Sequence, residues 1–305
     1  MTPLTLPPRV TVVEVGPRDG LQNEAAEVPT ATKIAFVDGL AAAGLPAIEI
    51  AAFVNPALVP QMRDASEVAR GIARRPATRY SALVPNARGL AAACEAGLTE
   101  VAIFAAASDT FSQRNINKTI EASLTAYAPV VRDAQTMGLR VRGYLSTAFG
   151  CPFEGAVPPA RVVELTARLL SMGVFEVAVS DTIGVATPGQ VVNLIEVLEE
   201  RVPIAAIALH LHDTRGTALA NVLAALGAGV TTFDASAGGL GGCPFAPGAA
   251  GNLATEDLLY MLHGLGIETG VDLDAVVRAS RLIAPALGHP LPSRYLQAAT
   301  ATPPA

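Results

Sequence analysis

The stretch AGLPAIEI, residues 43–50, contains the local pattern that decides the fold: a small residue, a glycine, an apolar residue and then a run rich in Val, Ile or Phe. The same pattern, with a small or flexible first residue, recurs in AGLTEVAI (96–103), MGLRVRGY (137–144), MGVFEVAV (172–179) and AGVTTFDA (228–235). Glycine adopts left-handed backbone at low cost and therefore often ends a helix. The β-branched run after it is typical of a strand that is buried on both faces. Each stretch therefore predicts a junction between a helix and the next strand.

Further β-branched runs predict strands at residues 10–16, 79–84 and 206–212. The segments between the strands have the apolar spacing of helices. One helix start is especially well marked, because Thr187 can cap the helix, Pro188 suits the first helical position and Gln190 can complete a capping box. Strand and helix units therefore alternate along the chain.

Eight such units in roughly 290 residues predict a closed parallel (β/α)8 barrel, the TIM barrel, with an open doubly wound sheet as the alternative. An additional C-terminal helix is expected near residues 272–287, packed outside the barrel. Since no linker-like segment divides the chain, residues 1–305 are expected to form a single catalytic domain.

The composition excludes several classes of protein. With 51% hydrophobic and 16% charged residues, the 305-residue chain can bury a large core and is not disordered. A net charge of −6 without a basic run argues against nucleic acid as a partner. Residues 216–233 carry no charge, but glycines and polar residues interrupt this run, so no membrane span is expected. Three scattered cysteines and the lack of a signal peptide favour a soluble cytoplasmic protein.

Polar residues collect at the carboxyl ends of the predicted strands, where the active sites of such barrels lie. They are Arg18 and Asp19 after the first strand, Glu49 on the second, Arg142 on the fifth, Asp181 at the end of the sixth, His210 and His212 on the seventh, and Cys243 and Asn252 in the loop after the eighth.

His210 and His212 are two residues apart on a strand, so their side chains point to the same face. Two separately hydrogen-bonded core histidines are the alternative, but two of only four histidines at one strand end favour a metal site. Asp19 can add a carboxylate and Asn252 an amide oxygen. This donor set without a thiolate predicts Mg²⁺ or Mn²⁺, with Zn²⁺, Co²⁺ and Fe²⁺ as alternatives.

Arg18 directly precedes Asp19, and adjacent residues at a strand end are expected to point in different directions. Its guanidinium could close the barrel mouth through a salt bridge or stabilise an oxyanion in the pocket. Glu49 is the nearest candidate by strand adjacency for the carboxylate that a buried arginine needs. Both roles are compatible.

The loop at residues 238–252 has four glycines within five residues, and we expect it to be a mobile segment over the active site. Cys243 in this loop is a candidate reactive thiol. Cys94 is expected to be a small apolar filler on a helix, and Cys151 could belong to either class.

Five stretches of this chain together resemble the 3-hydroxy-3-methylglutaryl-CoA lyase family. They are VEVGPRDGLQNE (13–24), VRGYLSTAFGCPFEG (141–155), SDTIGVATPG (180–189), HLHDTRGTALAN (210–221) and AGGLGGCPFAPGAAGNLATEDL (237–258). Arg-Asp-Gly-x-Gln and His-x-His mark only a metal-dependent barrel superfamily that also holds isopropylmalate and homocitrate synthases. The glycine-rich loop with its cysteine is specific to the lyase branch and its nearest relatives.

The resemblance implies a role for each candidate residue. It implies a divalent cation, Mg²⁺ or Mn²⁺, on Asp19, His210, His212 and Asn252. It also implies that Arg18 stabilises an enolate and binds substrate, that Glu49 supports Arg18, and that Cys243 is the catalytic thiol. Asp181 matches a catalytic position, Arg142 a substrate-binding position and Glu256 a supporting one.

The reaction implied is a retro-Claisen cleavage of an acyl-CoA, 3-hydroxy-3-methylglutaryl-CoA, to acetyl-CoA and acetoacetate, as in leucine degradation and ketone-body formation. The base that removes the hydroxyl proton could be Asp19, Asp181 or a metal-bound group. A homodimer is the default expectation for a cytoplasmic enzyme of this size.

The chain departs from the family pattern at Ala51 and Ala52, which make the second strand more apolar, at Ala25 in place of a lysine, and at Ser180 in place of a glycine. The substrate could therefore carry a longer 3-alkyl group. The chain could also be a Claisen condensing synthase, an aldolase acting on a 2-oxo acid, or a non-catalytic barrel that binds acyl-CoA or metal. The synthases usually carry an extra C-terminal region, and the non-catalytic barrel predicts loss of at least one site residue.

Overall fold

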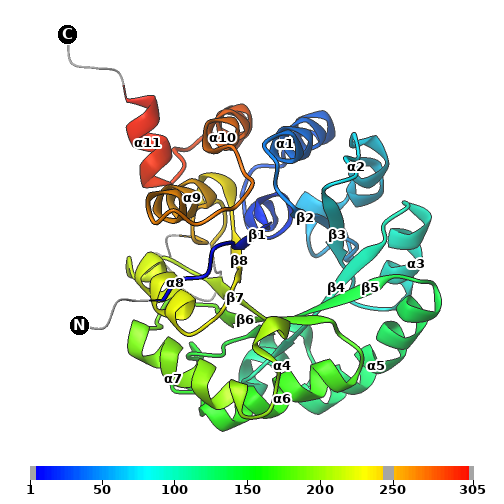
Figure 1. Ribbon diagram of the computed structural model, residues 1–305. Coiled ribbons are helices and arrows are strands. Elements are labelled where there is room, and N and C mark those ends of the chain that lie inside the picture. Colours follow the sequence, from blue (N-terminus) through cyan, green and yellow to red (C-terminus); the bar gives the residue numbers. More distant parts are fainter. Residues whose placement is uncertain (1–4, 243–250, 302–305) are drawn as a thin grey trace.

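The computed structural model describes residues 5–242 and 251–301 (Figure 1). Eight parallel strands form a closed barrel in which each strand pairs with the next and β1 pairs with β8. The strands are β1 (Thr11–Glu14), β2 (Ala47–Ala52), β3 (Arg79–Leu83), β4 (Glu100–Ala106), β5 (Arg140–Ser146), β6 (Glu176–Asp181), β7 (Ile207–Leu211) and β8 (Thr232–Ala235). The TIM barrel predicted from the sequence is confirmed, and the open doubly wound sheet is wrong.

Helices surround the barrel, and short helical turns connect some of the elements. The helices are α1 (Thr30–Ala42), α2 (Ala65–Gly71), α3 (Ala87–Glu95), α4 (Asp109–Ile116), α5 (Ile120–Thr136), α6 (Pro159–Ser171), α7 (Pro188–Glu199), α8 (Ala218–Gly227), α9 (Thr255–Gly264), α10 (Leu273–Leu287) and α11 (Arg294–Thr300). The turns are the π-helical η1 (Gly16–Gly20) and the 3₁₀ turns η2 (Pro60–Met62), η3 (Ile204–Ala206) and η4 (Ala237–Gly239).

The predicted junctions between helix and strand have the expected backbone. The glycines of the five repeated stretches all have positive φ angles, between 78° and 100°. At Gly44 there is also no room for a side chain, because a Cβ there would lie 2.5 Å from the carbonyl oxygen of Gly270. The start of α7 is as predicted, with Pro188 at its first turn and the backbone N–H of Thr187 donating to Gln190 at 3.0 Å.

The helices α10 and α11 extend the molecule beyond the eight barrel units. The predicted helix α10 packs against α1 outside the barrel (Figure 1), where a Cβ at Gly39 would lie 3.3 Å from the Cβ of Ala279. Helix α11 was not predicted. It begins at a cap in which Ser293 accepts from the backbone N–H of Leu296, and the side chain of Asp257 accepts from the hydroxyl of Ser293.

The core lies mainly between the strands and the helices. Side chains such as Phe36 and Leu40 of α1 and Ile48 of β2 are fully buried there. Cys94 of α3 is exposed, so the prediction of an apolar filler is wrong; Leu90 and Ala93 form the buried face of that helix. In the described part of the chain, no helix combines the length and apolar character needed to cross a membrane.

Candidate active site

Three potential metal ligands converge at the carboxyl end of the barrel. The turn η1 follows β1 and carries Asp19, whereas His210 and His212 come from the end of β7. Their ligand atoms all lie within 4.8 Å of one another. The Nε2 atom of His210 lies 3.3 Å from Nε2 of His212 and 3.8 Å from Oδ2 of Asp19. Because every second residue along β7 faces the barrel interior, both imidazoles lie next to the carboxylate of Asp19.

Asn252 completes this cluster and leaves an oxygen unpartnered. Its Nδ2 donates to Oδ2 of Asp19 at 2.9 Å and to the carbonyl of Leu240 at 3.0 Å. Its buried Oδ1 has no hydrogen-bond partner in the described part of the chain, and neither has Nδ1 of His212. An orphaned buried acceptor beside a carboxylate and two imidazoles fits a cation.

The electrostatic surroundings agree with this donor set. Burial, together with the neighbouring His210, lowers the pKa of His212 to about 4, so its imidazole is neutral near pH 7. The neutral imidazole is the form that binds a metal. The pKa of Asp19 is lowered to about 2: burial opposes ionisation, but Arg18 and the two histidines outweigh it. Asp19 is therefore a carboxylate at physiological pH.

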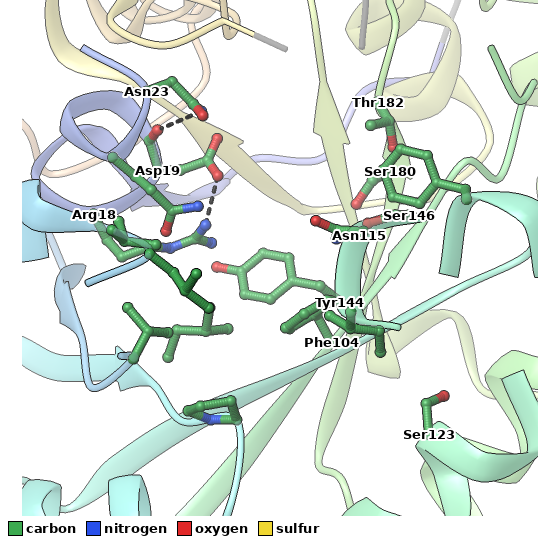
Figure 2. A pocket seen from close by; sticks show the side chains of 18 of the residues that line it. Arg18, Asp19, Asn23, Phe104, Asn115, Ser123, Tyr144, Ser146, Ser180 and Thr182 are labelled. Carbon is green, nitrogen blue, oxygen red and sulfur yellow. Dashed lines mark hydrogen bonds and ion pairs between the residues drawn. The ribbon is translucent and has the colours of Figure 1, made fainter. Parts of the chain in front are cut away.

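Arg18 is buried between two carboxylates. Its Nε donates to Oε2 of Glu49 at 2.5 Å. Its Nη1 donates to Oδ1 of Asp19 at 2.5 Å (Figure 2). The pairing of Arg18 with Glu49 is the one expected from strand adjacency. The expectation that Arg18 and Asp19 diverge is wrong, because they lie in the π-helical turn η1 and not on an extended strand. The guanidinium therefore lies beside the metal-ligand cluster.

Tyr144 is a site residue that the sequence reasoning missed. Its hydroxyl donates to Oε2 of Glu49 at 3.1 Å, and the centroid of its ring lies 5.1 Å from the guanidinium carbon of Arg18. Its side chain lines the cavity and lies at the centre of Figure 2. The available signal was spacing, since Tyr144 is two residues after Arg142 on β5 and must share its inward face.

Arg142 lies deeper in the barrel than expected for a substrate contact. Its Nε donates to Glu176 at 2.7 Å, and its two Nη atoms donate to Asp234 at 3.1 and 2.7 Å. It is 2% exposed and is absent from the residues that line the cavity. Arg142 thus lies below Tyr144 on β5, among the carboxylates that offset its burial, and the substrate-binding role expected of it stays a prediction.

Asp181 does not reach the cavity either. Its two oxygens accept from the backbone N–H groups of Val185 and Ala186, each at 2.9 Å, in the loop after β6. Its neighbours Ser180 and Thr182 line the cavity instead. In this structure Asp181 holds the loop after β6, because residues in extended backbone alternate in direction, and its catalytic role stays a prediction.

A cavity of about 730 Å³ opens beside Arg18, Asp19 and the two histidines. It continues past Tyr144 to an arm between β4, α4 and α5, where Phe104 and Ser123 lie (Figure 2). Ala51 and Ala52 do not line it, so the expectation of an apolar wall on the second strand is wrong. The register between β2 and β3 shifts after Glu49, and Val54, Leu58 and Val59 of the following loop face the cavity.

Two buried carboxylates hold the root of the glycine-rich loop. Glu14 accepts from the backbone N–H of Ala237 at 2.9 Å and from that of Gly16 at 2.7 Å. Glu256 accepts from the backbone N–H of Gly238 at 2.8 Å, which agrees with a supporting position. The loop root is thus tied to the start of η1. Cys243 lies outside the described residues.

Comparisons with known proteins place this chain in a family. The sequence profile of the HMGL-like family matches residues 9–283. The mitochondrial hydroxymethylglutaryl-CoA lyase of Bos taurus is 51% identical over 294 residues, which cover 96% of this chain and 90% of that protein.

Solved structures give the same result. The hydroxymethylglutaryl-CoA lyase of Pseudomonas aeruginosa matches with a TM-score of 0.95 at 51% identity, over 96% of this chain and 98% of that one. An HMG-CoA lyase of Acinetobacter baumannii in complex with coenzyme A and 3-methylmalate matches with a TM-score of 0.91 at 40% identity, over 97% and 96% of the two chains. The resemblance carried by the sequence motifs is confirmed. The chain therefore belongs to the HMGL-like family, and within that family it is similar to the hydroxymethylglutaryl-CoA lyases.

Proposed function

We propose that this protein is a hydroxymethylglutaryl-CoA lyase, which cleaves the C2–C3 bond of 3-hydroxy-3-methylglutaryl-CoA to give acetyl-CoA and acetoacetate. The observation that carries this proposal is the cluster of Asp19, His210 and His212 beside the buried pair of Arg18 and Glu49, at one edge of a cavity. The identity of about 50% to lyases over nearly the whole chain supports the same reaction.

Asp19, His210, His212 and Asn252 would hold a divalent cation, for which Mg²⁺ or Mn²⁺ is the proposed identity. When bound, the cation supplies Lewis-acid polarisation of the oxygens of the substrate and lowers the pKa of its hydroxyl group. The residues themselves contribute orientation, since Asn252 and Arg18 fix the two oxygens of Asp19.

Arg18 would stabilise the charge that develops when the C2–C3 bond breaks. The 3-hydroxyl loses its proton, its C–O bond becomes a ketone, and the electron pair of the C2–C3 bond forms the enolate of the thioester. A fixed guanidinium beside that enolate oxygen lowers the cost of separating charge, because Glu49 and Asp19 already hold it in place. Of the residues considered as the base, Asp19 lines the cavity and Asp181 does not.

Cys243 is proposed to protonate C2 of the enolate, which completes acetyl-CoA. The loop that carries it is proposed to close over the acyl-CoA and exclude water. A coenzyme A complex of a relative that is 40% identical supports the acyl-CoA as substrate. The cytoplasmic location, the homodimer and the place in leucine degradation stay predictions.

The same reaction on a longer 3-alkyl thioester is the second candidate. The observation that favours it is the arm of the cavity beyond Tyr144, where Phe104, Ile116 and Tyr127 provide an apolar lining. An alkyl chain in this arm would be removed from water at a gain of about 0.8 kcal/mol for each buried CH₂ group.

The test is an assay on purified protein from which metal has been removed with a chelator. The protein receives 3-hydroxy-3-methylglutaryl-CoA with or without Mg²⁺ or Mn²⁺, and acetyl-CoA and acetoacetate are both measured. Formation of both products in equal amounts, only with metal, is expected. No cleavage by folded, metal-supplied protein would direct the assay to a longer 3-alkyl thioester, and failure with both substrates would contradict the proposal.

A further inference from the structure

A connected series of buried ionic contacts begins at His210, one of the proposed metal ligands. Oδ2 of Asp234 lies 3.1 Å from Nδ1 of His210. Nη1 and Nη2 of Arg142 donate to Oδ2 and Oδ1 of the same carboxylate at 3.1 and 2.7 Å, and Nε of Arg142 donates to Glu176 at 2.7 Å. The side chain of Asp234 is completely buried, and that of Arg142 is 3% exposed. Neither lines the cavity.

The barrel register produces this arrangement. His210 on β7 pairs directly with Asp234 on β8. Side chains opposite each other on neighbouring strands lie within contact distance when both face inward. Arg142 arrives from β5 across the barrel interior and forms a two-point ion pair with the carboxylate, so the position of Asp234 is fixed by contacts other than the histidine.

The hydrogen bond between Asp234 and His210 determines where the proton of the imidazole lies. An ionised carboxylate can only accept, so the Nδ1 atom of a neutral His210 must carry the hydrogen. Its Nε2 is then a free lone pair that faces Nε2 of His212 and Oδ2 of Asp19. By contrast, Nδ1 of His212 has no partner in the described part of the chain.

We propose that Asp234, held by Arg142, is the positioning residue that selects the Nδ1–H tautomer of His210 and so presents Nε2 of that ring to the divalent cation. Carboxylates that orient a histidine ligand in this way commonly contribute 10–100-fold to metal affinity or activity. This inference rests on the proposed metal site, and Arg142 acts in it through Asp234 and not through the substrate.

The variant Asp234→Asn tests the proposal because an amide has only one acceptor oxygen. If that oxygen faces His210, the NH₂ group of the asparagine faces Nη2 of Arg142. Both groups are hydrogen-bond donors, so this contact is unfavourable. If the amide is reversed, the oxygen accepts from Nη2, and the NH₂ group donates to Nδ1 of His210 but also faces the donor Nη1 of Arg142. In the second arrangement the ring hydrogen moves to Nε2, which is the atom that the metal needs.

Two measurements report this directly. The Mn²⁺ dissociation constant is measured from the electron paramagnetic resonance signal of free Mn²⁺, and about 10–100-fold weaker binding is expected for Asp234→Asn. Glu100→Gln is the matched control, since Glu100 is also a buried strand carboxylate paired with arginines but lies at the opposite end of β4 from the site. It should bind Mn²⁺ as the wild type does.

The second measurement starts with the wild-type protein, so its first result does not depend on the folding of a variant. Selective ¹⁵N labelling of histidine leaves four imidazoles to assign, and long-range ¹H–¹⁵N spectra distinguish the two neutral tautomers. In the chelator-stripped wild-type chain at alkaline pH, His210 should be the Nδ1–H form, and in folded Asp234→Asn it should shift toward the Nε2–H form.

Several results would overturn the inference. One is an Nε2–H tautomer of His210 in the wild-type protein. Another is equal Mn²⁺ affinity in wild type and Asp234→Asn, or equal weakening in Glu100→Gln, which would indicate general destabilisation. Absence of Mn²⁺ binding by the wild type would also overturn it. A failed lyase assay with these binding differences intact would instead overturn only the proposed substrate.

Discussion

At the scale of single residues, the position of Arg18 is the feature most closely tied to the proposed chemistry. Its side chain is 7% exposed, and its guanidinium is paired with both Glu49 and Asp19. A buried cation between two carboxylates is held rigidly, and a rigid charge stabilises a developing anion without first reorganising. The position thus fits the step in which a thioester enolate forms.

Replacement of Arg18 by methionine should keep the approximate length of the side chain and remove its charge. We expect kcat to fall by about 10²–10³-fold, which is the usual effect of losing one fixed donor to an oxyanion. The measurement is steady-state cleavage at saturating metal. An unchanged kcat would show that the enolate is stabilised elsewhere.

The site could be predicted in part because its signals are local. The period of two on β7 indicated His210 and His212 as a pair, and adjacent strands suggested Glu49 beside Arg18. Depth inside the barrel has no such signal. Arg142 and Tyr144 share one face of β5, yet only Tyr144 reaches the cavity. The spacing shows that both side chains face inward, but it does not show which of the two residues lies close enough to the barrel mouth to reach the cavity.

At the scale of elements, Glu14 joins the turn η1 to the turn η4. Its Oε1 accepts from both Gly16 and Ala237, and its Oε2 accepts from the hydroxyl of Thr255 at 2.7 Å. A Cβ on Gly16 would lie 2.6 Å from Oε1 of Glu14, so a side chain there would displace this carboxylate. Burial raises the pKa of Glu14 from 4.5 to about 7, with hydrogen bonds from Thr255 and from backbone N–H groups opposing the shift.

This pKa has a consequence for stability. A carboxyl group with a raised pKa in the folded state contributes stability that is fully present below about pH 4.5 and is lost as pH rises through about 7. Glu14→Gln removes this dependence. By chemical denaturation, the variant should gain on the order of 3 kcal/mol in unfolding free energy relative to wild type between these two pH values. A difference that does not change with pH would contradict the assignment.

The elements themselves were predicted well where a repeated pattern marked them. Glycine at the helix end and a β-branched run after it located five of the eight strands. Helix α11 was missed because its seven residues, Arg294–Thr300, are too few to establish a helical period. The π-helical turn η1 was missed because Gly-Pro-Arg-Asp-Gly contains ordinary turn residues, and tertiary contacts decide its form.

At the scale of the whole molecule, a cation held by Asp19 after β1 and by His210 and His212 at the end of β7 would link parts of the closed barrel that are far apart in sequence. A ligand that binds only the folded state stabilises it by about 2.7 kcal/mol at 100 times its dissociation constant. Mn²⁺ should therefore raise the Tm of chelator-stripped wild-type protein in calorimetry.

His212→Ala should abolish most of that rise in Tm and also the lyase activity. His263→Ala is the matched control, because His263 is an exposed histidine of α9 that contacts Thr269 and not the cluster. It should retain the wild-type response. A full Mn²⁺-dependent rise in Tm for His212→Ala would contradict the assignment of His212 as a ligand.

The most direct test of the proposed reaction is cleavage of 3-hydroxy-3-methylglutaryl-CoA in D₂O with Mg²⁺, followed at once by mass spectrometry of the thioester product. An enolate protonated by an exchangeable group such as the thiol of Cys243 predicts acetyl-CoA with one deuterium in its methyl group. Unlabelled acetyl-CoA incubated with the protein under the same conditions should gain none. Formation of free coenzyme A instead of acetyl-CoA, or of acetyl-CoA without deuterium, would contradict the retro-Claisen account.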